Sequence, residues 1–145
     1  MPGNDPYVIT VGAVDMLRTT GYWGDDILPD WSANGPTLDG FPKPDILAPG
    51  GNVVSFMYND YGNMANSATL VQQHPDNSET ISLFRMNGTS MATAATSGVV
   101  ALMLEAQPEL TPDQVKYRLM ASARPALVDG DLGYNIFQQG MGRLW

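Results

Sequence analysis

Residues 90–106 restrict the fold more than any other stretch of the sequence, because they read as one helix that has to pack against other elements. The stretch contains no proline, and residues 99–104 are apolar on almost every side. A helix that is apolar all round is expected to be buried all round. Small residues stand before that run: Ala94, Ala95, Ser97 and Gly98. They would let other backbones approach closely, and Pro108 is expected to end the helix.

A second helix is predicted directly afterwards, because residues 111–114, Thr-Pro-Asp-Gln, combine three helix-start signals. Threonine suits the N-cap, proline suits the first helical position, and glutamine three residues after the threonine completes a capping box. The apolar face of this helix would come from Val115, Leu119 and Met120. The helix should end at residues 122–123.

Residues 7–14 form a continuous rather than alternating apolar run that is rich in β-branched side chains. Such a run is typical of a strand covered on both faces, as in a parallel sheet. Further strands are predicted at residues 45–50, 53–57 and 80–86, with a weaker candidate at 67–73. Short apolar strands with a buried helix predict an α/β layer arrangement in a single domain, residues 1–145.

Residues 16–44 contain few apolar runs and many Gly, Pro, Asp and Asn residues, so we interpret them as a long irregular connection. The large aromatic side chains of Tyr22, Trp23 and Trp31 lie in it. They form either a surface contact or a small satellite core, and the sequence does not separate these two hypotheses.

The composition argues against several classes of function. Fifteen acidic side chains oppose seven basic ones, for a formal net charge of −8, and the basic residues are scattered. Nucleic acid is therefore a poor partner, since its binding needs clustered Lys and Arg. The sequence has no cysteine, so disulfides and thiolate metal sites are excluded. No apolar run reaches the ~18 residues of a membrane span and no signal peptide is visible, so localisation stays undetermined.

The residues most suggestive of chemistry are 87–92, Asn-Gly-Thr-Ser-Met-Ala, where an extended run meets the central helix. Ser90 would lie among the unpaired backbone N–H groups and the positive end of that helix. Such donors stabilise the oxyanion that forms when a serine Oγ attacks a carbonyl. From the helix start alone, however, a plain N-capping role for Thr89 or Ser90 is the commoner outcome.

The string Gly-Thr-Ser-Met-Ala at residues 88–92, followed by a small-residue helix, resembles the nucleophile motif of the subtilase family of serine peptidases. Further segments resemble other landmarks of that family, in the family's order: residues 6–15, 32–36, 43–51 and 110–115. The resemblance extends over residues 3–143, and ordered landmarks are far more specific than one pentapeptide. It implies an α/β fold with a partial subtilisin-like parallel sheet, a buried nucleophile helix and a following amphipathic helix.

The resemblance also implies roles for individual residues. Ser90 matches the nucleophile, its backbone N–H matches one oxyanion donor, and the Thr89 hydroxyl would assist. The family's triad Asp and His and its oxyanion Asn have no match here, so the chain is similar to the C-terminal half of a subtilase catalytic domain. Ala94 and Ala95 stand where the family often has Pro and His, a change that we interpret as packing.

No cofactor and no metal ligand are expected from the residues themselves. Subtilases often bind calcium, yet no calcium ligand set can be carried over to this chain. Residues 129–131, Asp-Gly-Asp, are interpreted as a solvated turn rather than a calcium loop. The family is largely secreted, which implies an extracellular origin for the parent protein.

His74 is the one histidine of the chain. In one hypothesis it is a substitute base for Ser90, with Asp76 or Asp60 orienting its ring. In the other it is a histidine in a polar loop, which we favour because nothing in the sequence forces the imidazole near Ser90. A Ser–His pair would suit activated esters, whose leaving groups ask less of a general acid than amides do.

Three functions therefore stay open. The first is a serine hydrolase that acts on peptides through an acyl-enzyme on Ser90, with its peptidase machinery incomplete. The second is an ester hydrolase that uses Ser90 and His74, and the third is an inert fragment that oligomerises. Uncovered sheet edges and apolar faces drive association, so we predict a homo-oligomer, with a dimer as the expected state.

Overall fold

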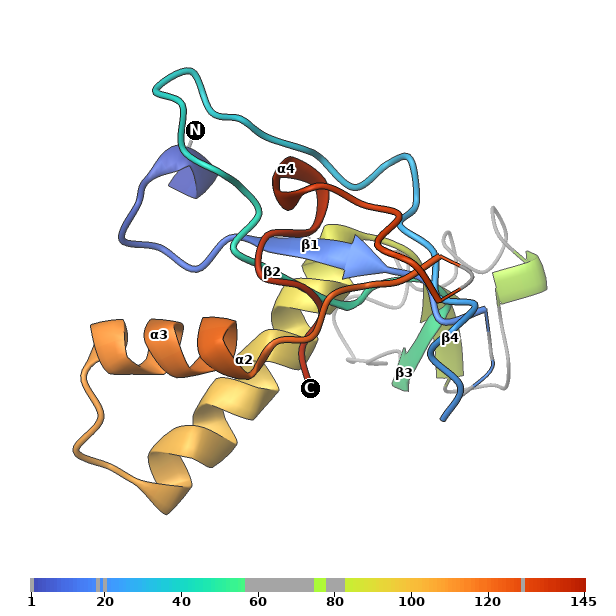
Figure 1. Cartoon of the computed structure of the whole chain (residues 1–145). Helices are drawn as coiled ribbons and strands as arrows, with labels where there is room; N and C mark the ends of the chain where they lie inside the picture. The colour runs from blue at the N-terminus through green and yellow to red at the C-terminus, as the bar shows by residue number, and fades with distance from the viewer. Residues whose placement is uncertain (1, 18, 20, 57–74, 78–82, 129) are drawn as a thin grey trace.

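The computed structural model of the chain describes residues 2–17, 19, 21–56, 75–77, 83–128 and 130–145 (Figure 1). The regular elements in chain order are η1 (Pro2–Asn4), β1 (Val11–Val14), β2 (Ile46–Pro49), β3 (Val53–Phe56), η2 (Pro75–Asn77), β4 (Leu83–Met86), α2 (Thr89–Ala106), α3 (Pro112–Ser122) and α4 (Ile136–Gln139). Helices combined with a small parallel sheet confirm the predicted α/β class.

β1 and β2 pair in parallel, with Val11 opposite Ile46 and Val14 opposite Pro49. Both strands are shorter than the apolar runs that predicted them. All of β1 is buried, and so is β2 as far as Ala48. Burial on both faces explains why the two segments read as continuous apolar runs instead of alternating ones.

The C-terminal segment lies along the far side of β2. Leu47 N–H donates to Gly142 O at 2.8 Å, and Leu144 N–H donates back to Leu47 O at 2.7 Å. The other edge of β1 pairs with no strand in the described part of the chain. That edge is a place where a further strand could add.

The hydrophobic core lies between the β1–β2 pair, α2 and α3, and Figure 1 shows α2 passing along the strand pair. Its buried members are Val11, Ala13, Ile46, Ala48, Ala92, Val115 and Leu119. Val115 and Leu119 are four residues apart and so share one face of α3. The predicted apolar face of the second helix is thereby confirmed, with Met120 packed at the margin of the core.

α3 begins as the sequence predicts. Gln114 N–H donates to Thr111 Oγ1 at 3.3 Å, and Thr111 N–H donates to Gln114 Oε1 at 3.0 Å, which is the expected capping box. The short α4 was not predicted, although Asn135 and Gln138 form a capping box of the same kind. Its four residues are too few for a periodic apolar face to reveal it.

α2 forms over nearly the predicted residues, but the expectation that it is buried on every side is wrong for this chain. Its buried residues are Ala92 and Thr96, whereas Leu102 is 65% exposed. Two short strands and α3 cover only one side of an 18-residue helix.

Within the described ranges, no helix combines the length and hydropathy that crossing a bilayer requires.

β3 and β4 pair antiparallel, from Val53 opposite Met86 to Phe56 opposite Leu83. The strands predicted at residues 53–57 and 80–86 are confirmed where the structure describes them, and the candidate at 67–73 lies outside the described residues. β4 is followed within three residues by α2. This ladder therefore helps to set where α2 begins.

Trp23 forms a small satellite cluster with the C-terminal segment. Its ring packs edge-to-face on Trp145, with the centroids 4.9 Å apart. The guanidinium of Arg143 lies 4.3 Å from the Trp23 ring centroid, and that of Arg124 lies 3.7 Å from the Trp145 centroid. Such cation–π contacts favour Arg over aromatic faces. Tyr22 and Trp31 are exposed, and Trp23 itself remains 43% exposed within this cluster.

Asp26 is the acidic residue of this cluster. Its Oδ2 binds Arg143 Nη1 at 2.5 Å, while its Oδ1 has no hydrogen-bond partner in the described part of the chain. Burial raises the pKa of Asp26 above its ordinary value of 3.8, although Arg143 acts in the opposite direction. The folded protein therefore holds a proton on Asp26 more tightly than the unfolded chain does.

The variant Asp26→Asn should change how stability depends on pH. Between the ordinary pKa of 3.8 and the higher folded value, the folded state binds more protons at Asp26, so this residue lowers the free energy of unfolding as the pH rises. Removing the carboxyl should make the slope of unfolding free energy against pH more positive in that window. Urea denaturation at several pH values measures the slope, with the exposed Asp30→Asn as control. Equal slopes in wild type and Asp26→Asn would contradict the assignment.

Candidate active site

Ser90 lies exposed at the start of α2, as the second residue of the helix. Gly88 is the N-cap, and its φ of 155° lies in the region that favours glycine. No side chain caps this helix, so the alternative in which Thr89 or Ser90 is an N-cap is wrong. The Ser90 hydroxyl forms no hydrogen bond with any described residue.

The backbone around Ser90 leaves hydrogen-bond donors free. Met91 N–H donates to Gly88 O at 3.1 Å, whereas the N–H groups of Thr89 and Ser90 have no acceptor among the described residues. They are the orphan donors that a helix N-terminus leaves, beside the positive end of the helix dipole. A carbonyl attacked by Ser90 Oγ would find its developing oxyanion next to these donors.

Thr89, which the family resemblance makes an assisting residue, is half-buried beside Ser90. Its backbone O accepts from Thr93 Oγ1 at 2.9 Å, within the first turns of α2. The structure thus brings Thr89 and Ser90 together at one helix end, as the sequence predicts. The catalytic roles of both residues stay predictions.

The turn after β2 holds this helix start in place. Gly88 N–H donates to Gly50 O at 2.9 Å, and Asn52 N–H donates to Asn87 Oδ1 at 2.5 Å. A Cβ on Gly50 would lie 2.7 Å from Ala13 Cβ and 2.8 Å from Gly88 O. Only glycine lets β1, β2 and the helix start come this close, so the carboxyl ends of the two strands carry the start of α2.

Sequence reasoning missed Asn52 and Asn87 as positioning residues. Asn52 Nδ2 also donates to Asp15 Oδ2 at 3.1 Å, which joins the turn to the residue after β1. The sequence signals were Pro-Gly-Gly-Asn at residues 49–52 and Asn-Gly at 87–88, both typical of turns. Neither signal names a distant partner, which is why the link between the two turns was not predicted.

His74 and Asp60, the proposed substitute base and one of its orienting acids, lie outside the described residues. Asp76, the other acid, lies in η2, where its backbone O accepts from Arg85 Nη2 at 2.7 Å. Within the described part of the chain, no hydrogen bond joins Asp76 to Ser90. The pairing of Ser90 with His74 stays a prediction.

The described residues contain no group of three or more His, Asp and Glu side chains that could hold a metal ion. Calcium prefers six or more oxygen ligands, several of them carboxylates. At the predicted solvated turn, Val128 and Asp131 exchange two backbone hydrogen bonds, at 2.9 and 3.0 Å. The described residues therefore offer no cluster of carboxylates for calcium, and calcium binding stays an expectation from the family resemblance.

Comparisons with known proteins agree on one family. The family model described as "Subtilase family" matches residues 1–142. Serine protease AprX of Bacillus subtilis (strain 168) is 43% identical over 117 residues, which cover 79% of this chain and 24% of that protein. Mycosin-5 of Mycobacterium tuberculosis is 34% identical over 145 residues, which cover 96% of this chain and 20% of that protein.

Among solved structures, fervidolysin from Fervidobacterium pennivorans, a keratinolytic enzyme related to subtilisin, is similar with a TM-score of 0.66 and 25% sequence identity. The similarity covers 99% of this chain and 19% of that chain. This likeness confirms the expectation of a subtilisin-like fold. The chain spans about a fifth to a quarter of the length of these relatives.

The contact at Gly50 can be tested by adding one methyl group. Gly50→Ala should destabilise the protein by about 1–3 kcal/mol, because the Cβ overpacks against Ala13 and Gly88. The matched control is Gly98→Ala in α2, where an added Cβ meets nothing within 4 Å and should stabilise the helix by up to about 1 kcal/mol. Urea denaturation of both variants measures the effects. If Gly50→Ala had the same free energy of unfolding as wild type, the turn would not be in close contact with the helix start.

Proposed function

Because the chain belongs to the subtilase family of serine peptidases, we propose that Ser90 is the nucleophile of a serine hydrolase that reacts through an acyl-enzyme. The observation that carries the proposal is the exposed Ser90 hydroxyl at the N-terminus of α2, beside two backbone N–H groups without an acceptor among the described residues. Peptides are the proposed substrates, since the relatives are proteases by name.

The proposed reaction has two halves. Ser90 Oγ attacks the scissile carbonyl carbon and gives its proton to a general base, while the Ser90 N–H donates to the oxyanion and the Thr89 hydroxyl assists. The tetrahedral intermediate collapses to an ester on Ser90 and releases the amine, which takes the proton. Water then attacks the ester, and the acid leaves as Ser90 recovers its proton.

The base is the part of this scheme that the family's motifs do not supply here. The triad Asp and His and the oxyanion Asn of subtilases have no match in the 145 residues. A serine hydroxyl without a base is a weak nucleophile at neutral pH. Peptide hydrolysis by Ser90 therefore depends on a base from outside the matched motifs.

An ester hydrolase that uses His74 as this base is the second candidate. The observation that favours it is the contact between Arg85 of β4 and the Asp76 backbone in η2, directly after His74 in the chain. Since β4 leads into α2, this hydrogen bond joins Asp76, two residues after His74 in the sequence, to the strand that precedes Ser90. Activated esters need less help from a general acid, so a Ser–His pair suffices for them.

Hydrolysis of a short-chain p-nitrophenyl ester separates these candidates. If Ser90 and His74 act together, Ser90→Ala should reduce the rate to the background of the buffer, and His74→Ala should reduce it by about 100-fold or more. The control Ser97→Ala removes another hydroxyl of α2, one that donates to Thr93 O, and should leave the rate unchanged. Casein or a peptide amide in the same assay tests for peptidase activity.

Loss of ester hydrolysis in Ser90→Ala but not in His74→Ala would support Ser90 as the nucleophile and reject His74 as its base. Activity that survives Ser90→Ala would contradict both candidates.

A third candidate is an inert module that associates with a second copy of itself. One side of α2 is uncovered by any described element, and the neighbouring edge of β1 pairs with no described strand. No charged residue occurs in α2 before Glu105, so two copies can meet there without like charges facing one another. Apolar faces and open edges of this kind favour association.

The dimer is tested by light scattering at rising protein concentration, where twice the monomer mass is expected. Leu102→Glu places a charge on the uncovered side of α2 and should shift the mass towards the monomer. Leu132→Glu is the control, because Leu132 is 72% exposed but lies outside α2 and β1. A monomer at high concentration in wild type would overturn this proposal.

A further inference from the structure

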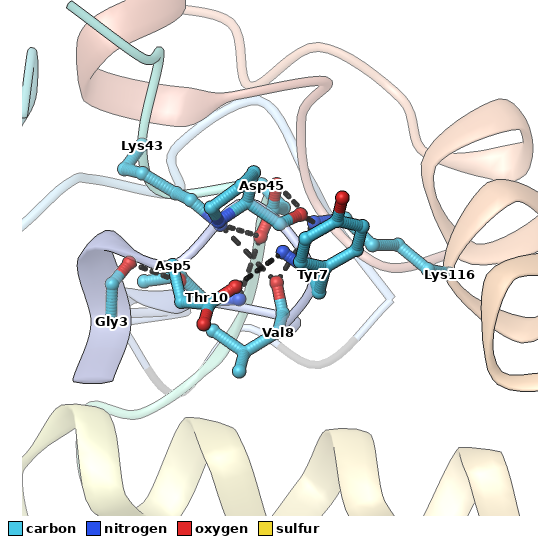
Figure 2. Close-up of polar contacts among 9 residues, drawn as sticks. Gly3, Asp5, Tyr7, Val8, Thr10, Lys43, Asp45 and Lys116 are labelled. Carbon is cyan, nitrogen blue, oxygen red and sulfur yellow. Dashed lines mark hydrogen bonds and ion pairs between the residues drawn. The ribbon is translucent and has the colours of Figure 1, made fainter. Parts of the chain in front are cut away.

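The chain has two lysines, Lys43 and Lys116, and both converge on one buried aspartate (Figure 2). Lys43 Nζ lies 2.8 Å from Asp45 Oδ2, and Lys116 Nζ lies 3.1 Å from Asp45 Oδ1. The side chains of Lys43 and Asp45 are 8% and 7% exposed, and that of Lys116 is 16% exposed. The candidate active site uses none of the three.

Backbone oxygens complete the surroundings of the two ammonium groups. Lys116 Nζ donates to Pro6 O at 2.6 Å and to Val8 O at 2.8 Å. Lys43 Nζ donates to the same Val8 O at 3.2 Å. Two carboxylate oxygens and two carbonyl oxygens therefore surround the two ammonium groups, and each of these oxygens is hydrogen-bonded to or ion-paired with a lysine.

The loop that presents these carbonyls is itself held by hydrogen bonds, as Figure 2 shows. Tyr7 N–H donates to Asp5 Oδ1 at 2.7 Å, and Thr10 Oγ1 donates to Gly3 O at 2.7 Å. Thr10 N–H donates to Asp45 Oδ2 at 2.7 Å. The oxygens are thus fixed by the fold and do not depend on the lysines alone for their direction.

Carboxylate and main-chain carbonyl oxygens that converge in this way are the donor set of a hard metal cation such as calcium. A lysine ammonium offers three N–H donors and a positive charge, so it can take the same place. Lys116 Nζ donates to Pro6 O and Val8 O and forms an ion pair with Asp45 Oδ1. Lysine in the place of a metal ion is an alternative to the calcium binding that is frequent in the family that this chain resembles.

We propose that the Asp45 cluster is a cation site whose cations are the chain's own two lysine ammonium groups. The positive charges of the two lysines then stabilise the start of the sheet, and no metal ion is needed there. Replacing both lysines would leave the Asp45 carboxylate with the Thr10 N–H alone, next to two carbonyl oxygens that have lost their lysine donors. Such a site should take up calcium from solution.

Thermal unfolding tests this proposal. The melting temperature of wild type should be the same in millimolar calcium and in chelator. The double variant Lys43→Met/Lys116→Met should melt about 10 °C lower in chelator, because a buried carboxylate loses both of its ion-pair partners, and should regain several degrees in calcium. The control Arg143→Met breaks another buried ion pair, the one with Asp26, around which no described carbonyl oxygen is hydrogen-bonded to the Arg143 side chain, and should not respond to calcium.

Two results would overturn the proposal. Calcium that raises the melting temperature of wild type would mean that the lysines do not fill the site. A double variant that is destabilised but indifferent to calcium would mean that the oxygens form no cation site.

A measurement on wild type decides the matter even if the double variant does not fold. Acetic anhydride acetylates accessible lysines, and mass spectrometry of peptides assigns the sites. Lys43 and Lys116 should both resist modification in the folded protein and react fully in denaturant, with calcium making no difference. Rapid acetylation of either lysine in the native protein would overturn the proposal.

Discussion

The buried carboxylate of Asp45 is the interaction on which the start of the sheet depends. Its Oδ2 accepts from Thr10 N–H and from Lys43 Nζ, and its Oδ1 forms an ion pair with Lys116 Nζ. Its backbone N–H donates to Thr10 O at 2.8 Å, and its backbone O accepts from Met141 N–H at 2.9 Å. One residue therefore joins the loop before β1, the first rung of the parallel pair, α3 and the C-terminal segment. Leaving such a buried charge without partners costs roughly 3–5 kcal/mol, so these elements are held jointly.

Different interactions stabilise the two ends of the β1–β2 pair. Ion pairs and carbonyls fix the end where the strands begin, whereas close backbone contact fixes the end where they finish. There Gly50 lies against Ala13 and Gly88, and the start of α2 is bound to the turn through Asn52 and Asn87. A helix N-terminus placed by backbone contact leaves its first N–H groups directed outwards, which is what an oxyanion requires.

Local signals predicted much of this fold. The capping box at Thr111 and the apolar runs of β1 and β2 each depend on neighbours in sequence, and they appear where expected. The exposure of α2 could not be predicted in the same way, because burial depends on which other elements cover a helix. Ser90 was found from its motif, but its N-cap is a glycine with φ of 155°, a backbone property that composition does not specify. The Asp45 cluster escaped prediction because Lys116 lies far along the chain and meets Asp45 only once α3 docks.

The burial of the two lysines also affects the electrostatic field around the molecule. The chain carries 15 acidic and seven basic side chains, and two of the seven are withdrawn from the surface to surround Asp45. Carboxylates therefore dominate the charge at the solvent-exposed surface. Two copies approach each other against a mutual repulsion that dissolved salt screens over about 10 Å at 0.1 M. Ionic strength thus becomes a control on self-association, although α2 itself carries no charge on the residues that precede Glu105.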